Sequence, residues 1–205
     1  MKHHSKATVV IEGDMIKKIF KSEEEFYTEY HFYKEYSEFP YIPKFISADN
    51  YTIYLEYIKG KNLYDCNITE QLFLAKTLAL FHNYSFDEEN KTAILHYDTN
   101  LRNYICINNE VFMIDFSNIS IDYPLCDVYS ALLFFAELYA PDVFKGFCDE
   151  FYNTYFSFLK IKLPHSRDKL ENEIKRFEER RERENKIIYN YHWFLKNISC
   201  LSLFT

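Results

Sequence analysis

The fold of this 205-residue chain is indicated by two stretches of sequence, HYDTNLRN at His96–Asn103 and IDFS at Ile114–Ser117. The residues between them predict a β-hairpin, with strands at Tyr104–Ile107 and Val111–Ile114 on either side of the turn Asn108-Asn109. Because a tight hairpin returns the chain to its starting point, the oxygen-bearing side chains of both stretches are expected at its open end.

Asp98, Asn103 and Asp115 are the candidate chemical groups in these stretches. The pattern H-x-D-x-x-x-x-N, followed by an apolar residue, Asp and Phe at a strand end, resembles the signature of the protein-kinase-like phosphotransferases. In that family an Asp orients and deprotonates the attacking hydroxyl, and oxygen ligands hold Mg²⁺ on the phosphates of ATP. The resemblance therefore implies ATP and Mg²⁺ as cofactors, Asp98 as the catalytic base, and Asn103 and Asp115 as the metal ligands.

The first sixty residues predict a small antiparallel sheet with one helix on it. Ser22 and Glu25 have capping-box spacing and start a helix that is expected to run to about Glu38. Four segments are predicted to be strands: Ala7–Ile11, Met15–Phe20, Phe45–Ala48 and Tyr51–Ile58.

Within this region the resemblance implies a nucleotide site. Lys18 is the expected ligand of the α- and β-phosphates, with Lys17, which points to the other face of the strand, as the alternative. Glu29 is the expected partner of that lysine, and Glu25, one helical turn earlier, remains open. A charged residue of either kind, taken alone, is ordinarily a solvated surface group.

YLEYI at Tyr54–Ile58, followed by Gly60, resembles the kinase hinge that binds adenine. By that resemblance Leu55 occupies the gatekeeper position, and the backbone of Glu56 and Ile58 hydrogen-bonds adenine. The alternative interpretation is a simple edge strand.

Beyond Lys59–Lys61 the pattern becomes mostly helical. The expected helices are Thr69–Tyr84, 125–139, 142–160, 166–185 and 186–199. Arg167–Lys186 interleaves both charge signs and is interpreted as a solvated helix face joined by i,i+4 pairs. The predicted fold class is α+β and two-lobed, with a nucleotide-binding N-lobe at 1–59 and a mostly helical C-lobe at 60–205 that holds the catalytic loop, metal site and acceptor site.

DYPLCD at Asp122–Asp127 opens the first of the late helices. It resembles a run in aminoglycoside and choline phosphotransferases whose second Asp braces the backbone of the catalytic loop. The resemblance implies a structural role for Asp127. His96 is interpreted as a packed, hydrogen-bonded core histidine and His82 as unremarkable.

Composition excludes several classes of function. The net charge of −7 disfavours nucleic-acid binding, and with only three glycines the chain has no glycine-rich phosphate loop. Five scattered cysteines indicate reduced thiols rather than disulfides or a zinc site. The longest apolar stretch, Tyr129–Ala140, is 12 residues long, short of the roughly 20 that a membrane span needs. These features predict a cytoplasmic protein, and they leave the oligomeric state open.

Departures from the family pattern bear on the acceptor. Ser117 replaces the glycine that usually follows Asp-Phe, and only ten residues separate Phe116 from Asp127, so the segment on which protein kinases dock peptides is missing. This points to an atypical kinase that resembles aminoglycoside and choline phosphotransferases and RIO-type kinases. A small-molecule hydroxyl is the favoured acceptor. The alternatives are an atypical serine/threonine protein kinase and a nucleotide-binding pseudokinase that serves as an interaction module.

Overall fold

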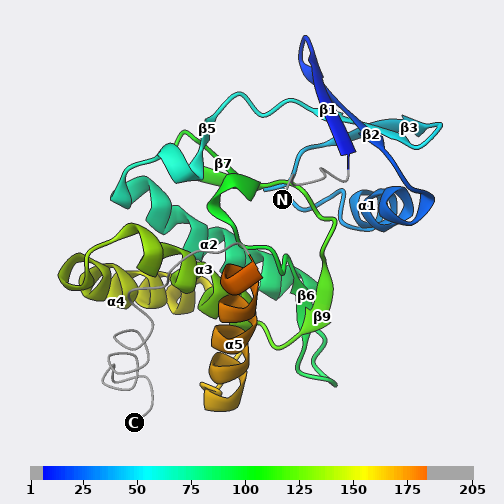
Figure 1. Ribbon diagram of the computed structural model, residues 1–205. Helices are drawn as coiled ribbons and strands as arrows, with labels where there is room; N and C mark the ends of the chain where they lie inside the picture. Colours follow the sequence, from blue (N-terminus) through cyan, green and yellow to red (C-terminus); the bar gives the residue numbers. More distant parts are fainter. Residues whose placement is uncertain (1–6, 184–205) are drawn as a thin grey trace. The chain divides into compact units, whose positions relative to one another are not determined.

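The computed structural model describes residues 7–183, which divide into two compact units (Figure 1). Unit 1 comprises the chain up to Cys66 together with Arg102–Asn118, and unit 2 comprises Asn67–Leu101 and the chain from Ile119 onward. The hairpin at 104–114 thus belongs with the N-terminal residues. The assignment of functional lobes to 1–59 and 60–205 stays a prediction, and the helix expected at 186–199 lies outside the described residues.

Unit 1 contains the predicted small antiparallel sheet, whose four strands lie in the order β1-β2-β4-β3. Its strands are β1 (Ala7–Glu12), β2 (Met15–Phe20), β3 (Phe45–Asp49) and β4 (Thr52–Glu56). Gly13, with a φ of +64°, allows the tight turn from β1 to β2. Lys18 is paired with Val9 on one side and Ile53 on the other, which places it on an inner strand.

Helix α1 (Glu23–Glu35) packs on this sheet (Figure 1). The Ser22 hydroxyl accepts a hydrogen bond from the Glu25 backbone at 3.3 Å, so the predicted helix start is correct. The helix ends three residues before the expected Glu38. Its buried residues are Phe26, Glu29, Phe32 and Tyr33, so a carboxylate lies among aromatic side chains on the packed face.

A second sheet of unit 1 has the order β5-β7-β8. Its strands are β5 (Lys61–Asn62), β7 (Tyr104–Ile107) and β8 (Glu110–Met113). The 3₁₀ turn Leu63–Asp65 follows β5, and the 3₁₀ turn Leu101–Asn103 precedes β7. Asn108 and Asn109 both have positive φ, as a two-residue hairpin turn of type I′ requires. Gly60 lets β5 approach β7, because a Cβ there would lie 2.4 Å from the Cys106 carbonyl oxygen.

Unit 2 is mainly helical. It contains α2 (Ile68–Ser85), α3 (Leu125–Leu138), α4 (Pro141–Phe158) and α5 (Arg167–Arg183), with a two-stranded sheet of β6 (Ala93–Leu95) and β9 (Ser120–Asp122). Helix α3 is buried along most of its length and contacts α2, α4 and α5, so it forms the core of the unit. Among the described residues, no helix is both long and apolar enough to cross a membrane.

Helix α5 has the solvated face that the charge pattern predicts, and its other face is packed. Leu170, Ile174 and Phe177 are buried, and α5 packs against α3. Arg181 is also buried and pairs with Glu137 of α3. The predicted i,i+4 pairing is present at the exposed start of the helix, where Arg167 Nε lies 2.8 Å from Glu171 Oε1.

Candidate active site

Three predicted residues meet in unit 1 around the ammonium group of Lys18. Lys18 Nζ lies 2.5 Å from Glu29 Oε1 and 2.9 Å from Asp115 Oδ1. The Lys18 and Glu29 side chains are buried, whereas 46% of the Asp115 side chain is exposed. The three charged groups therefore form one cluster, with Lys18 and Glu29 in the interior of the unit and Asp115 partly at its surface.

The alternatives for this pair lie elsewhere. Lys17 is half-buried and its Nζ lies 5.8 Å from the centre of the Tyr54 ring. Glu25 is half-buried at the start of α1, where its backbone is capped by Ser22. Lys17 and Lys18 have different surroundings because neighbouring residues of β2 point to opposite faces of the sheet.

The electrostatics of this group follow from its burial. Burial raises the pKa of Glu29 to about 7, although the nearby Lys18 charge opposes the shift. For Lys18, burial disfavours the charged form, but the carboxylates of Glu29 and Asp115 outweigh it and raise the pKa. Lys18 thus stays a cation, while Glu29 binds a proton far more readily than a solvated glutamate.

The residues at 115 and 116 are held in an uncommon backbone geometry. Asp115 has a φ of +65°, in the left-handed region that non-glycine residues rarely adopt. Phe116 is fully buried and stacks on Phe32 of α1, with ring centres 3.8 Å apart and planes 19° apart. Tyr33 contacts the same ring edge-on at 5.4 Å. Packing of Phe116 on α1 therefore stabilises the strained turn that directs Asp115 toward Lys18.

Asn103 lies at the other side of the same hairpin. The Ile114 backbone N–H donates to the Asn103 carbonyl at 2.9 Å, one step beyond the last strand pair, Tyr104 with Met113. Asn103 and Asp115 thus flank the open end of the hairpin, as the sequence predicts. An amide and a carboxylate are hard oxygen donors, and this donor chemistry fits Mg²⁺.

The proposed hinge residues lie at the end of β4, where Glu56 is the last residue of the strand, and just beyond it at Ile58. The Glu56 N–H donates to the Lys44 carbonyl at 2.9 Å, on the β3 side of the strand, and the Tyr57 N–H donates to the Asp14 carbonyl at 2.9 Å. Within residues 7–183 the N–H of Ile58 donates no hydrogen bond, while its carbonyl accepts from Gly60 at 3.0 Å. A ligand can therefore reach the Ile58 N–H without breaking a bond of the fold.

Asp98 belongs to unit 2, where Asp127 holds the loop that precedes it. Asp127 Oδ2 accepts from the His96 N–H at 2.7 Å, and Oδ1 accepts from the Tyr97 N–H at 2.9 Å. Tyr97 has a φ of +63°, and the Asp98 N–H donates back to the His96 carbonyl at 2.8 Å. The predicted structural role of Asp127 is confirmed, since its carboxylate fixes a strained three-residue turn.

Two sets of residues in this region were missed by the sequence interpretation. His82 is fully buried, with Nδ1 at 2.8 Å from the Tyr155 hydroxyl and Nε2 at 3.4 Å from Asp127 Oδ2. Arg176 and Arg180 of α5 reach Tyr97 and Asp98, respectively. Their i,i+4 spacing places both arginines on one helix face, which is the signal that sequence alone offered.

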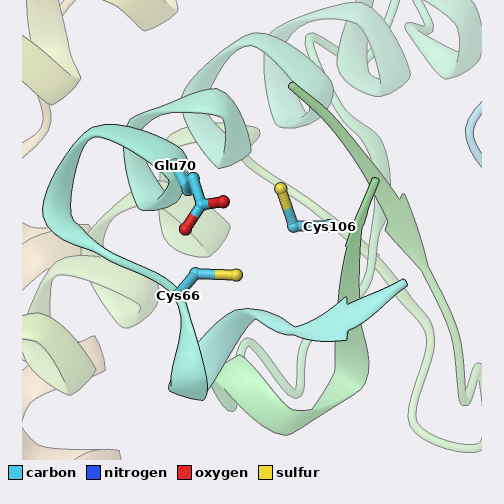
Figure 2. A group of neighbouring side chains, drawn as sticks. All are labelled: Cys66, Glu70 and Cys106. Carbon is cyan, nitrogen blue, oxygen red and sulfur yellow. The ribbon is translucent and has the colours of Figure 1, made fainter. Parts of the chain in front are cut away.

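Cys66 and Cys106 bring two thiols of unit 1 together, with Sγ atoms within 4.8 Å of each other (Figure 2). The Cys66 thiol also donates to the Asn62 carbonyl at 3.4 Å. Glu70, drawn with them, caps α2 by accepting from the Asn67 N–H at 2.9 Å. Two thiols of unit 1 fall short of the four ligands of a structural zinc site.

Comparison with known proteins identifies solved structures that are similar to this chain. No protein-family model matches the sequence, and a comparison with curated protein sequences found no match. Choline kinase LicA from Streptococcus pneumoniae is similar in structure over 97% of this chain and 89% of its own, with 15% identity and a TM-score of 0.57. Aminoglycoside phosphotransferase APH(3'')-Id from Streptomyces rimosus, solved with ADP and streptomycin, matches over 79% and 85%, with 13% identity and a TM-score of 0.61.

The chain has a protein-kinase-like fold. A choline/ethanolamine kinase family protein from Mesorhizobium loti has it too, over 75% of this chain and 67% of its own, with 12% identity and a TM-score of 0.58. These similarities confirm the predicted fold class and the predicted resemblance to choline and aminoglycoside phosphotransferases. The resemblance to RIO-type kinases stays a prediction.

Proposed function

We propose that this protein is an ATP-dependent phosphotransferase that moves the γ-phosphate of ATP to a hydroxyl group of a small molecule. The observation that carries the proposal is the buried Lys18–Glu29 pair with Asp115 at its exposed end. A buried ion pair contributes little to stability, because desolvation offsets the attraction between its charges. A ligand that binds the Lys18 ammonium group explains why the buried Lys18–Glu29 pair is present in so small a unit.

The residues of unit 1 have distinct roles in this proposal. Lys18 donates to the α- and β-phosphates while Glu29 holds its ammonium group in place. The Glu56 carbonyl and the Ile58 N–H bind the adenine edge. Asn103 and Asp115 would hold Mg²⁺, which neutralises charge on the phosphates when bound.

Asp98 acts on the acceptor. Its carboxylate orients the acceptor hydroxyl and takes its proton as the oxygen bonds to the γ-phosphorus, and the bond from that phosphorus to the β–γ bridging oxygen breaks, leaving ADP. Asp127 supports this role by fixing the backbone of His96 and Tyr97 immediately before the base. Catalysis of this kind depends mainly on positioning.

The solved structures support a small-molecule acceptor. One neighbour is a choline kinase and another was solved with ADP and streptomycin. The short segment between Phe116 and Asp127 also leaves little room to dock a peptide. An enzyme that draws on ATP and Mg²⁺ in this way would act in the cytoplasm.

Release of ADP from Mg²⁺–ATP, with water as the acceptor, tests the proposal before the natural acceptor is known. The wild type is expected to release ADP slowly, and Asp98→Asn to release it at least about 100-fold more slowly, since general-base catalysis contributes factors of this size. Asp149→Asn, an exposed carboxylate on α4, serves as the matched control and should match the wild type. Equal rates in Asp98→Asn and the wild type would remove Asp98 from the mechanism, and nucleotide binding without turnover would favour a pseudokinase.

A further inference from the structure

The peptide group between Tyr97 and Asp98 is hydrogen-bonded at both of its polar atoms. The Asp98 N–H donates to the His96 carbonyl at 2.8 Å. The Tyr97 carbonyl accepts from Nη1 of Arg176, on helix α5, at 3.2 Å. Because a peptide group is planar, hydrogen bonds at its N–H and its carbonyl together set the orientation of the plane. The Cα atom of Asp98 lies in the same plane, so these two bonds determine where the side chain of the proposed base begins.

The backbone at Tyr97 is strained, and charged groups hold it from two sides. Tyr97 has a φ of +63° and is the central residue of the turn that the His96–Asp98 hydrogen bond closes. A three-residue turn with a positive φ is rare and persists only where surrounding groups stabilise it. The Asp127 carboxylate accepts from the Tyr97 N–H at 2.9 Å, and the Arg176 guanidinium donates to the Tyr97 carbonyl. An anion therefore binds the N–H of this residue and a cation binds its carbonyl.

The Arg176 guanidinium is itself fixed by its other contacts. Its central carbon lies 3.8 Å from the centre of the Tyr97 ring. Its Nε donates to Glu173 Oε2 at 2.9 Å, and its Nη2 donates to the hydroxyl of Ser130, on α3, at 3.4 Å. A guanidinium can bind a ring face, a carboxylate and a carbonyl together because it is planar and has five N–H donors. These contacts tie the turn before Asp98 to both α3 and α5.

We propose that Arg176 is a positioning residue of the phosphotransferase, which holds the Tyr97–Asp98 peptide in the orientation that directs the Asp98 carboxylate to the acceptor hydroxyl. Arg176 acts through Asp98 and touches none of the reacting atoms. This inference rests on the proposed phosphotransferase function and gives α5 a part in it. Because the proposed nucleotide ligands belong to unit 1, loss of Arg176 lowers the rate of phosphoryl transfer without weakening nucleotide binding.

Two measurements on Arg176 variants test the inference: the kcat of ADP release from Mg²⁺–ATP, and the Kd of Mg²⁺–AMP-PNP, a non-hydrolysable analogue, by calorimetry. Arg176→Ala is expected to lower kcat at least about tenfold, since a small misplacement of a catalytic group is this costly. The Kd should stay within about twofold of the wild-type value, because the lost interaction serves the transfer step alone. Arg176→Lys keeps the positive charge beside Glu173, so that the unit folds, but lacks the planar group, and its kcat should fall by a smaller factor.

Two further comparisons separate positioning from a general loss of packing. Arg181→Lys is the matched control, because Arg181 is a buried arginine of the same helix that pairs with Glu137 of α3, and its kcat should match the wild type. The second comparison combines Arg176→Ala with Asp98→Asn, with rates measured in single turnover. In that background Arg176→Ala should change the rate less than about twofold, because the group that it positions is already lost.

Wild-type rates in both Arg176 variants would overturn the inference. So would an equal loss in Arg181→Lys, an equally large loss in the Asp98→Asn background, or a loss that comes only from weaker binding of Mg²⁺–AMP-PNP. Asp98→Asn alone separates this failure from failure of the proposed function. If that variant is slow, any of these results removes only the role of Arg176. If the wild type releases no ADP, or Asp98→Asn releases it at the wild-type rate, both proposals fail.

Discussion

The ammonium of Lys18 is bound by one buried carboxylate and one partly exposed carboxylate, and this environment distinguishes it from Lys17. The sequence favoured Lys18, because the segment Met15–Phe20 resembles the kinase strand that carries the phosphate lysine, and it left Lys17 as the alternative. The pattern alone could not exclude Lys17, since either residue of an alternating strand can face the helix. The structure places Lys18 against Glu29, and the choice depends on how β2 pairs with β1 and β4.

Lys18→Met is expected to weaken nucleotide binding strongly and to lower the free energy of unfolding by about 3 kcal/mol at pH 8, because it leaves Glu29 as an unpaired buried charge. At pH 5 the loss should be smaller, since Glu29 then takes up a proton. Urea denaturation at both pH values measures this difference. Lys17→Met is the matched control, and equal losses in the two variants would contradict the assignment of Lys18.

The pH dependence of stability reports on Glu29. Its folded pKa, about 7, lies above the unfolded value of 4.5, so the folded state holds this proton more tightly. The stability that Glu29 contributes is therefore present at acidic pH and is lost as the pH rises from about 4.5 through 7. Glu29→Gln should remove this part of the pH dependence, so its unfolding free energy relative to the wild type should rise between pH 5 and pH 8. A constant difference would contradict a raised pKa for Glu29.

At the scale of elements, the four-stranded sheet, α1, and the β7–β8 hairpin were predictable because each has a regular pattern with clear turn or capping residues. Strands β5, β6 and β9 were missed because two or three residues carry too little periodicity. The charge pattern of α5 did not reveal its packed face, since Leu170, Ile174 and Phe177 are separated by glutamates and basic residues. Arg176 and Arg180 were missed for the same reason.

Asp127 joins α3 to the turn that carries Asp98, and its removal tests that connection. Asp127→Ala is expected to lower the free energy of unfolding by about 3 kcal/mol, because the buried His96 N–H and the half-buried Tyr97 N–H lose a charged acceptor. ADP release should fall as well, since the strained Tyr97 backbone is no longer held. Chemical denaturation and the ADP assay measure both effects, with Asp149→Ala as the control. An unchanged stability would contradict the role assigned to Asp127.

At the scale of the whole molecule, the order of the motifs along the chain predicted the fold although overall sequence similarity is low. The similar structures share between 11% and 16% of their residues with this chain. The division into units was harder to predict, because contacts group Arg102–Asn118 with the first 66 residues. The boundary predicted at Lys59–Lys61 rests on the change to a helical pattern, and a local pattern holds no information about which distant segments contact each other.

The measurement that tests the proposed nucleotide site most directly is the thermal unfolding midpoint with ATP, with Mg²⁺ and with both. A ligand at 100 times its Kd adds about 2.7 kcal/mol, which raises the midpoint of a protein this size by about 5–10 °C. We predict this rise with ATP and Mg²⁺ together, its loss in Asp115→Asn, and its retention in Asp149→Asn. No rise in the wild type, or an equal rise in Asp115→Asn, would contradict the account.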